Sequence, residues 1–303
     1  MMKESSSLTT EAINPLSEKI DTLSPLEIVQ LMNAEDAKIA EAVAREADSI
    51  AKAIEVATGR IRSGGRLVYI GAGTSGRLGV LDASECPPTF NTPAEMVVGL
   101  IAGGDTALRK AAEGVEDHPE AAVIDLKAID LTGKDVLVGI ASSGRTPYVI
   151  GALDYAREVG AYAIGLVCNE NSQMASHADL MLAPVVGPEI ISGSTRMKAG
   201  TATKMVLNMI STGTMVQLGK TFGNYMVDLR ASNSKLIVRS RRIAAALAGI
   251  TEGQAEEELK KCDGELKTTV VMLRKNVSPQ AARTLLEKHG GQLRLALEED
   301  LQE

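Results

Sequence analysis

Two segments rich in glycine and hydroxyl residues are the part of this chain best suited to binding a phosphate. Gly71-Ala-Gly-Thr-Ser-Gly-Arg77 follows the apolar run 67–70, and Ala141-Ser-Ser-Gly-Arg-Thr146 follows the apolar run 136–140. Each pattern predicts a buried strand, a turn and then a helix. Such a turn presents backbone N–H groups and a helix N-terminus, which favour an anion. Two hydroxyl-rich turns at strand ends indicate a sugar-phosphate site more than a nucleotide site.

A third segment, Ser192-Gly-Ser-Thr195, adds hydroxyl groups and a nearby lysine at position 198. Each of the three segments also has a purely structural interpretation: tight packing for the glycines, helix capping for the hydroxyls and a solvated basic edge for the lysine. The candidate substrate-binding residues are Gly73, Thr74, Ser75, Ser142, Ser143, Gly144, Thr146, Ser194, Thr195 and Lys198.

The first turn also matches the dinucleotide-binding pattern Gly71-x-Gly73-x-x-Gly76. In that fold an acidic residue at the end of the second strand binds the ribose. Here Glu95 lies at the start of the expected second strand, and Asp105 lies beyond its end, later than usual. The nucleotide interpretation is therefore weakened but stays open.

Two glutamates are candidates for acid–base chemistry. Glu85 lies in Asp82-Ala-Ser-Glu-Cys-Pro-Pro88, at the end of the helix that the first turn begins, where the helix dipole disfavours a negative charge. Glu116 lies between two expected helices, shortly before Pro119. Composition and spacing do not choose between this pair and its acidic neighbours. Those neighbours are Asp82, Glu113, Asp117 and Glu120.

The composition argues against several classes of function. The 303 residues carry a net charge of −7, 2% aromatic residues and no tryptophan, which argues against nucleic-acid binding. Three separated cysteines and three histidines give no zinc-ligand spacing, so neither a structural nor a catalytic zinc ion is expected. The cysteines fit a reducing compartment, and no apolar run reaches the ~20 residues of a membrane span. We therefore expect a cytoplasmic globular protein.

Short apolar strands that alternate with helices predict an α/β fold with a parallel sheet covered on both faces. Before the sheet, Ser24-Pro predicts a helix start, and the preceding 23 residues are expected to be irregular. Short helices follow Gly249. The expected strands are 66–71, 96–101, 135–140, 162–167 and 179–183, and the expected helices within and after the sheet are 75–83, 106–113, 119–128, 146–159 and 195–219.

Several longer motifs resemble those of the N-acetylmuramic acid 6-phosphate etherase family, which has the sugar isomerase (SIS) fold and is similar to the glucokinase regulatory protein. The motifs are 71–79, 82–90, 113–117, 139–148 and 193–201, and the resemblance runs from about residue 12 to the C-terminus. It implies a three-layer sandwich around a five-stranded parallel sheet. The implied domains are an N-terminal arm (1–23), a catalytic SIS domain (24–248) and a small UBA-like helical domain (249–303).

The resemblance also implies a reaction. The family cleaves the D-lactyl ether of N-acetylmuramic acid 6-phosphate to give N-acetylglucosamine 6-phosphate and D-lactate, without metal or nucleotide, in cell-wall sugar recycling. By matching motifs, Glu85 is expected to be the general acid and Glu116 the second acid–base carboxylate. A homodimer with sites near the subunit interface is also implied. Which glutamate removes the C2 proton, and what the C-terminal domain does, stay open.

Two other functions fit the same turns. An aldose–ketose isomerase on this fold also removes a C2 proton, but it needs no acid directed at C3. A non-catalytic sugar-phosphate sensor needs the phosphate turns alone. Release of lactate separates the etherase from both.

Overall fold

The computed structural model describes residues 8–229 and 234–299. The chain divides into two compact units. The first comprises Met1–Ser84 and Ala94–Ser211, and the second comprises Glu85–Pro93 and Thr212–Glu303. In the described part of the chain, no helix combines the length and apolar character needed to cross a membrane.

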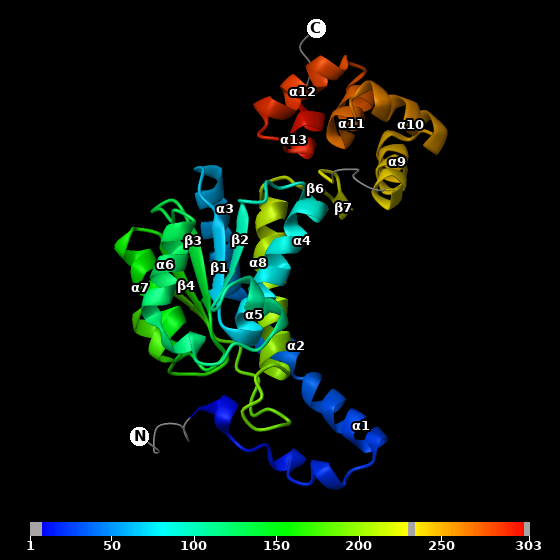
Figure 1. The fold of residues 1–303 in the computed structure, drawn as a ribbon. Coiled ribbons are helices and arrows are strands. Elements are labelled where there is room, and N and C mark those ends of the chain that lie inside the picture. The colour runs from blue at the N-terminus through cyan, green and yellow to red at the C-terminus, as the bar shows by residue number, and fades with distance from the viewer. Residues whose placement is uncertain (1–7, 230–233, 300–303) are drawn as a thin grey trace. The chain divides into compact units, whose positions relative to one another are not determined.

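The first unit is built around a five-stranded parallel sheet (Figure 1). The central strand, β3, and its neighbour β1 are buried along their whole length, because their residues are covered from both faces. All five strands lie within one residue of their expected bounds. The strands are β1 (Leu67–Gly71), β2 (Val97–Ile101), β3 (Val136–Ile140), β4 (Tyr162–Leu166) and β5 (Leu180–Leu182), in the order β2-β1-β3-β4-β5.

Helices cover both faces of this sheet, which gives the expected three layers (Figure 1). Helices α6 (Pro119–Ala128) and α7 (Pro147–Glu158) form one core with strand residues such as Val68 and Leu137. The opposite face is covered by α3 (Ala47–Arg62), α4 (Gly73–Phe90) and α8 (Lys198–Gln217).

The strand order reverses direction between β1 and β3. From β1 the chain crosses to β2 on one side, and it then returns to add β3, β4 and β5 on the other side. Ligands of open parallel sheets bind at the carboxyl ends of the strands where such a reversal occurs. The first two candidate turns follow β1 and β3, so both lie at this position.

The N-terminal segment is more ordered than the sequence suggested. Its described part, which begins at residue 8, forms three short 3-10 helices and buries Thr10, Asn14 and Ser17. Residues 1–7 of the expected arm lie outside the described part. The short helices are η2 (Thr9–Glu11), η3 (Pro15–Ser17) and η4 (Ile20–Thr22).

After the N-terminal segment, the predicted cap at Ser24 is confirmed. Ser24 and Glu27 form a reciprocal capping box that begins α1 (Pro25–Asp36), and α2 (Ile39–Ala44) follows before α3. The capping box satisfies two of the backbone N–H groups that the first turn of α1 leaves without partners.

Two helix expectations were wrong in extent. Helix α4 continues to Phe90, past Pro87 and Pro88, instead of ending at 83. Helix α5 (Asp105–Arg109) ends four residues early, because Lys110 is extended and Gly114 has a φ of 75°. Residues 110–114, most of which were expected to be helical, instead connect α5 to the 3-10 helix η5 (Val115–Asp117).

The second unit is a helical module with its own hydrophobic core. A two-stranded hairpin, β6 (Thr221–Phe222) and β7 (Tyr225–Met226), precedes α9 (Ser234–Ala248). The core joins residues of α9, such as Ile243, to residues of the later helices, such as Val270 and Leu286. It therefore extends across the expected boundary at 248/249. The later helices are α10 (Glu252–Lys261), α11 (Leu266–Lys275), α12 (Pro279–Lys288) and α13 (Leu293–Glu298).

Candidate active site

The first turn is closed so tightly that two of its glycines cannot carry a side chain. A Cβ on Gly76 would lie 2.6 Å from the carbonyl oxygen of Gly71, and a Cβ on Gly71 would lie 2.8 Å from the nitrogen of Gly76. Gly73, with a φ of 54°, then begins α4 directly. Thr74 and Ser75 follow in the first helical turn, whose N–H groups have no partner within a helix. The turn thus serves close packing and also presents an anion-binding helix end.

Hydrogen bonds from residues that follow β4 fix the position of the second turn. The carbonyl oxygen of Ser142 accepts hydrogen bonds from the backbone N–H of Cys168 (3.0 Å) and from Nδ2 of Asn169 (2.8 Å). Gly144 has a φ of 69°, and a Cβ there would collide with the side chain of Ser172. Thr146 precedes α7, but its side chain makes no capping hydrogen bond. Helix capping therefore does not account for the Thr146 hydroxyl.

The structure brings these two turns together at the strand reversal. Gly71 and Ile140, the last residues of β1 and β3, pair in the sheet. A Cβ on Gly71 would lie 3.0 Å from the carbonyl oxygen of Ile140. The N-terminus of α4 and the hydroxyls of the second turn therefore border the same edge of the sheet.

The third segment also reaches this edge. The Cβ that Gly200 lacks would lie 3.4 Å from the carbonyl oxygen of Thr195 and 3.5 Å from Cγ2 of Thr74. The N-terminus of α8 itself is already occupied, because the buried carboxylate of Glu189 accepts hydrogen bonds from the N–H groups of Lys198 (3.0 Å) and Ala199 (2.9 Å). This segment can thus offer hydroxyls, whereas its helix end is not open to an anion.

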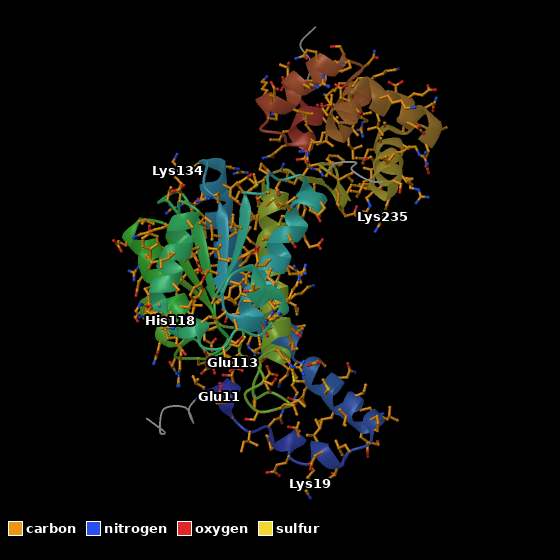
Figure 2. The ribbon with its side chains drawn as sticks, in the orientation of Figure 1. Glu11, Lys19, Glu113, His118, Lys134 and Lys235 are labelled. Atoms are coloured by element: carbon orange, nitrogen blue, oxygen red, sulfur yellow. The ribbon has the colours of Figure 1, made fainter. Side chains whose placement is uncertain are left out.

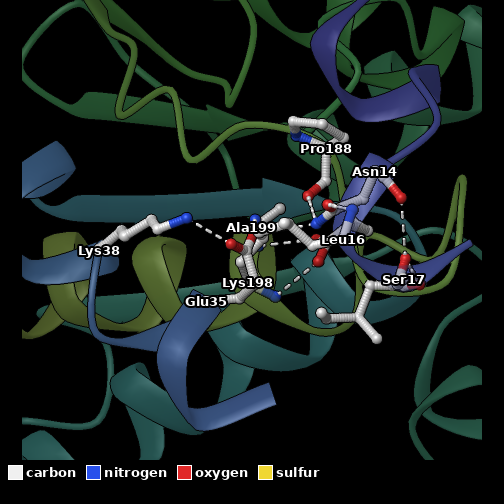
Figure 3. Close-up of polar contacts among 10 residues, drawn as sticks. Asn14, Leu16, Ser17, Glu35, Lys38, Pro188, Lys198 and Ala199 are labelled. Atoms are coloured by element: carbon white, nitrogen blue, oxygen red, sulfur yellow. Dashed lines mark hydrogen bonds and ion pairs between the residues drawn. The ribbon is translucent and has the colours of Figure 1, made fainter. Parts of the chain in front are cut away.

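Lys198 was expected at the substrate, but the structure places its ammonium in a buried ion pair (Figure 3). Lys198 is 1% exposed, and its Nζ lies 2.7 Å from Oε2 of Glu35. The same oxygen accepts a hydrogen bond from Asn14 (3.0 Å), and Lys38 pairs with the other oxygen of Glu35. Burial raises the pKa of Glu35, but hydrogen bonds from both lysines and the charge of Lys198 outweigh it and lower the pKa to about 2.

Sequence reasoning missed Glu35 and Glu189 as parts of this region. Glu35 lies 163 residues before Lys198, and no local pattern links the two positions. The sequence contained one hint, the charge of Lys198 itself, because a lysine that is buried at the start of a helix requires a counter-charge.

Glu116 lies in η5, near the carboxyl end of β2. Val115 lies against Gly103, just after that strand, and Pro119 packs on Gly151 of α7. The Glu116 side chain is exposed, as are the residues before and after it that Figure 2 labels, Glu113 and His118. In the same view Lys134, which leads into β3, lies at the opposite edge of the sheet.

Glu85 lies far along α4. The hydroxyl of Tyr69 in β1 donates a 2.9 Å hydrogen bond to Asp82, and Gly99 of β2 contacts Val80, so α4 runs back along the sheet. At a rise of 1.5 Å per residue, Asp82 is about 14 Å from Gly73 along the helix and Glu85 about 18 Å. The Glu85 side chain is exposed.

A cavity of about 280 Å³ adjoins the second turn. One wall carries Ser143 and Arg145, and another carries residues of the N-terminal segment. The N-terminal segment therefore lies close to a part of the chain that is expected to bind substrate. The lining residues are Leu8, Thr9, Ser143, Arg145, Glu170, Asn171, Ser172 and Gln173.

Comparisons with known proteins agree with this architecture. Residues 49–157 match the family model of the glucokinase regulatory protein N-terminal SIS domain, and residues 115–212 match the SIS domain model. A protein from Bacteroides fragilis, proposed to be a phosphosugar isomerase involved in capsule formation, superposes with a TM-score of 0.50 at 22% identity. That match covers 64% of this chain and 91% of the other. At this identity the likeness shows the SIS fold alone.

Full-length relatives are much more similar. N-acetylmuramic acid 6-phosphate etherase of Rhodopirellula baltica is 61% identical over 97% of both chains. The proteins of the same name from Vibrio vulnificus and Clostridium beijerinckii are 52% and 53% identical, and each match covers at least 96% of both chains.

Proposed function

Because the chain belongs to the family of N-acetylmuramic acid 6-phosphate etherases, we propose that it uses water to cleave the D-lactyl ether of that sugar phosphate. It is an enzyme of the lyase class, and its products are N-acetylglucosamine 6-phosphate and D-lactate. The reaction belongs to the recycling of cell-wall amino sugars, and we place it in the cytoplasm. The observation that carries the proposal is the meeting of three hydroxyl-rich segments at one edge of the sheet.

In this proposal the edge of the sheet binds the 6-phosphate. The N–H groups in the first turn of α4 and the hydroxyls of Ser142, Ser143 and Thr146 surround the anion, and Ser194 and Thr195 add hydroxyls from the third segment. Lys198 acts indirectly, since its charge is neutralised by Glu35. Fixing the phosphate holds C2 and C3 of the sugar at a defined distance from this edge, which lowers the entropic cost of reaction.

The chemistry is an elimination followed by a hydration. In the open-chain sugar, a carboxylate removes the C2 proton, which is acidified by the C1 aldehyde. The C3–O bond then breaks, and a carboxylic acid protonates the departing lactate oxygen. Water adds across the C2–C3 double bond, returning a proton to C2 and a hydroxyl to C3. One of Glu85 and Glu116 must start ionised and the other protonated.

The reach of a hexose phosphate argues that Glu85 acts across a subunit interface. Six bonds of about 1.5 Å separate phosphorus from C2, so the two are at most roughly 8 Å apart. Glu85 lies about 18 Å along α4 from the helix end that would bind the phosphate, and its side chain is only a few bonds long. We therefore propose a homodimer in which each site combines Glu116 of one protomer with the partner subunit's Glu85.

Two measurements test this function. The first is enzymatic detection of D-lactate after incubation with N-acetylmuramic acid 6-phosphate. Lactate release supports the etherase, whereas a ketose formed without lactate would support the isomerase alternative. Binding without any product would support the sensor.

The second measurement mixes two inactive variants, Glu85→Gln and Glu116→Gln, after reversible dissociation. If the site is shared, each mixed dimer has one intact site, so random mixing restores about a quarter of wild-type activity. The control mixes Glu85→Gln with the double variant E85Q/E116Q, which has no intact combination. Lack of recovery in the first mixture, with mixed dimers shown to form, would place both carboxylates in one protomer.

A further inference from the structure

The N-terminal residues 10–17 contact two separate parts of the candidate active site. They lie more than 150 residues from both contacts in sequence. The contacts are polar and mostly buried, so they fix the segment in one position.

The first contact joins the segment to the second turn. Nδ2 of Asn169 donates hydrogen bonds to Oγ1 of Thr10 (2.9 Å) and to the carbonyl oxygen of Ser142 (2.8 Å), and the backbone N–H of Thr10 donates to Oδ1 of Asn169 (3.1 Å). Thr10 is completely buried, and Asn169 is 1% exposed. Asn169 thus transmits the position of Thr10 directly to the backbone of Ser142.

The second contact joins the segment to the irregular stretch that leads into the third segment and to that segment's first residue. Oγ of Ser17 donates a 2.7 Å hydrogen bond to the carbonyl oxygen of Ile190, and Oγ of Ser192 donates to the carbonyl oxygen of Glu11 (3.3 Å). Asn14 donates to Glu35 (3.0 Å), which pairs with Lys198 at the start of α8 (Figure 3). Residues on both sides of 194–195 are therefore connected to the N-terminal segment, Ile190 and Ser192 by direct hydrogen bonds and Lys198 through Glu35.

We propose that residues 10–17 form a positioning element that sets the separation between the hydroxyls of the second turn and those of Ser194 and Thr195. This inference rests on the proposed function, because it assumes that the two hydroxyl groups bind one phosphate. A tetrahedral anion needs its donors within hydrogen-bond distance at the same time, so a shift of either group weakens binding without unfolding the sheet.

The double variant Thr10→Val with Ser17→Ala removes one hydrogen bond from each contact and keeps the side-chain volumes similar. We expect its affinity for inorganic phosphate, measured by ³¹P NMR titration, to fall roughly tenfold. The single variant Thr10→Ser keeps the hydroxyl that accepts from Asn169, so it should bind phosphate more tightly than Thr10→Val. Thr22→Val is the matched control, because the exposed Thr22 hydroxyl donates its hydrogen bond locally, to the carbonyl oxygen of Lys19 at the N-cap of η4.

Unchanged phosphate affinity in the double variant would overturn the proposal, even if its unfolding midpoint falls, because the segment would then act on stability alone. An equal loss in Thr22→Val would also overturn it. If the double variant does not fold, the single variants Thr10→Val and Ser17→Ala decide by the same criterion. The phosphate titration tests the positioning element without any catalysis. The lactate assay is a separate experiment, and wild-type protein that releases no lactate would refute the proposed function but not the positioning element.

Discussion

Replacing Lys198 by methionine should destabilise the first unit by several kcal/mol, because it leaves a buried carboxylate without its main counter-charge. Glu35 is 4% exposed and holds Lys198 at 2.7 Å. Methionine is similar in length to lysine and carries no charge. The substitution therefore removes the ion pair with little change in packing.

The pKa of Glu35 gives the size of the effect. A fall from 4.5 to about 2 on folding corresponds to a contribution of about 3 kcal/mol at neutral pH. Because the folded-state pKa is the lower one, this contribution is complete above pH 4.5 and is lost as the pH falls toward 2. K198M removes the hydrogen bond and the charge of Lys198 but leaves the hydrogen bonds from Lys38 and Asn14, so its loss of stability should be of this order at pH 7 and should shrink as the pH falls toward 3.

Urea unfolding followed by tyrosine fluorescence measures this difference. The chain has no tryptophan, and four of its five tyrosines, at positions 69, 148, 155 and 162, belong to the first unit. The signal therefore reports mainly on the unit that contains the ion pair. This matters because a chain with two units need not unfold in one step.

Two further variants make the test specific. Lys52→Met removes an exposed pair with Glu55 and should cost less than about 0.5 kcal/mol. The double variant E35Q/K198M removes both charges and should regain most of the lost stability. If K198M is as stable as Lys52→Met at pH 7, or if its deficit does not shrink at pH 3, the reasoning about Glu35 is wrong.

Two other predictions concern the second turn and the thiols. Gly144→Ala should lower phosphate affinity more than tenfold and stability by about 2 kcal/mol, because a Cβ there meets Ser172 at a φ of 69°. Gly64→Ala, at a glycine with a φ of 83° and open space after α3, should cost only about 1 kcal/mol and leave phosphate affinity unchanged. All three cysteines are buried, and burial raises the pKa of Cys168 to about 12. A thiol reagent such as DTNB should therefore find no reactive cysteine in the folded protein at pH 8 and three in urea, and rapid reaction of the native protein would contradict this.

The sheet could be predicted from the sequence because each strand carries its own signal. Apolar runs such as 67–70 and 136–140 are bounded by glycine-rich turns, and the strands they predict were right to within one residue. The first two candidate turns were predicted from the same local patterns. Their meeting at one edge followed from the rule that parallel strands place their carboxyl ends together.

Contacts between distant residues could not be predicted in this way. The lysine of the third segment looked like a ligand, because its counter-charge, Glu35, lies in another helix. The N-terminal segment looked irregular, because its order comes from hydrogen bonds to residues such as Asn169 and Ile190 rather than from an apolar period. Glu85 was expected at the end of its helix but lies within α4, because the helix continues through two prolines that normally indicate a helix end.

The sequence separation between the N-terminal segment and its partners, Asn169 for Thr10 and Ile190 for Ser17, has a consequence for biosynthesis. Thr10 and Ser17 are translated well before Asn169 and Ile190, which lie 159 and 173 residues later, and at about 5–20 residues per second this delay is on the order of 8–35 s. During that interval the nascent chain can form its early helices. The separation between the hydroxyls of the second turn and those of Ser194 and Thr195 is not yet fixed. Newly made enzyme should therefore acquire its affinity for phosphate only late in translation, after most of the sheet has formed.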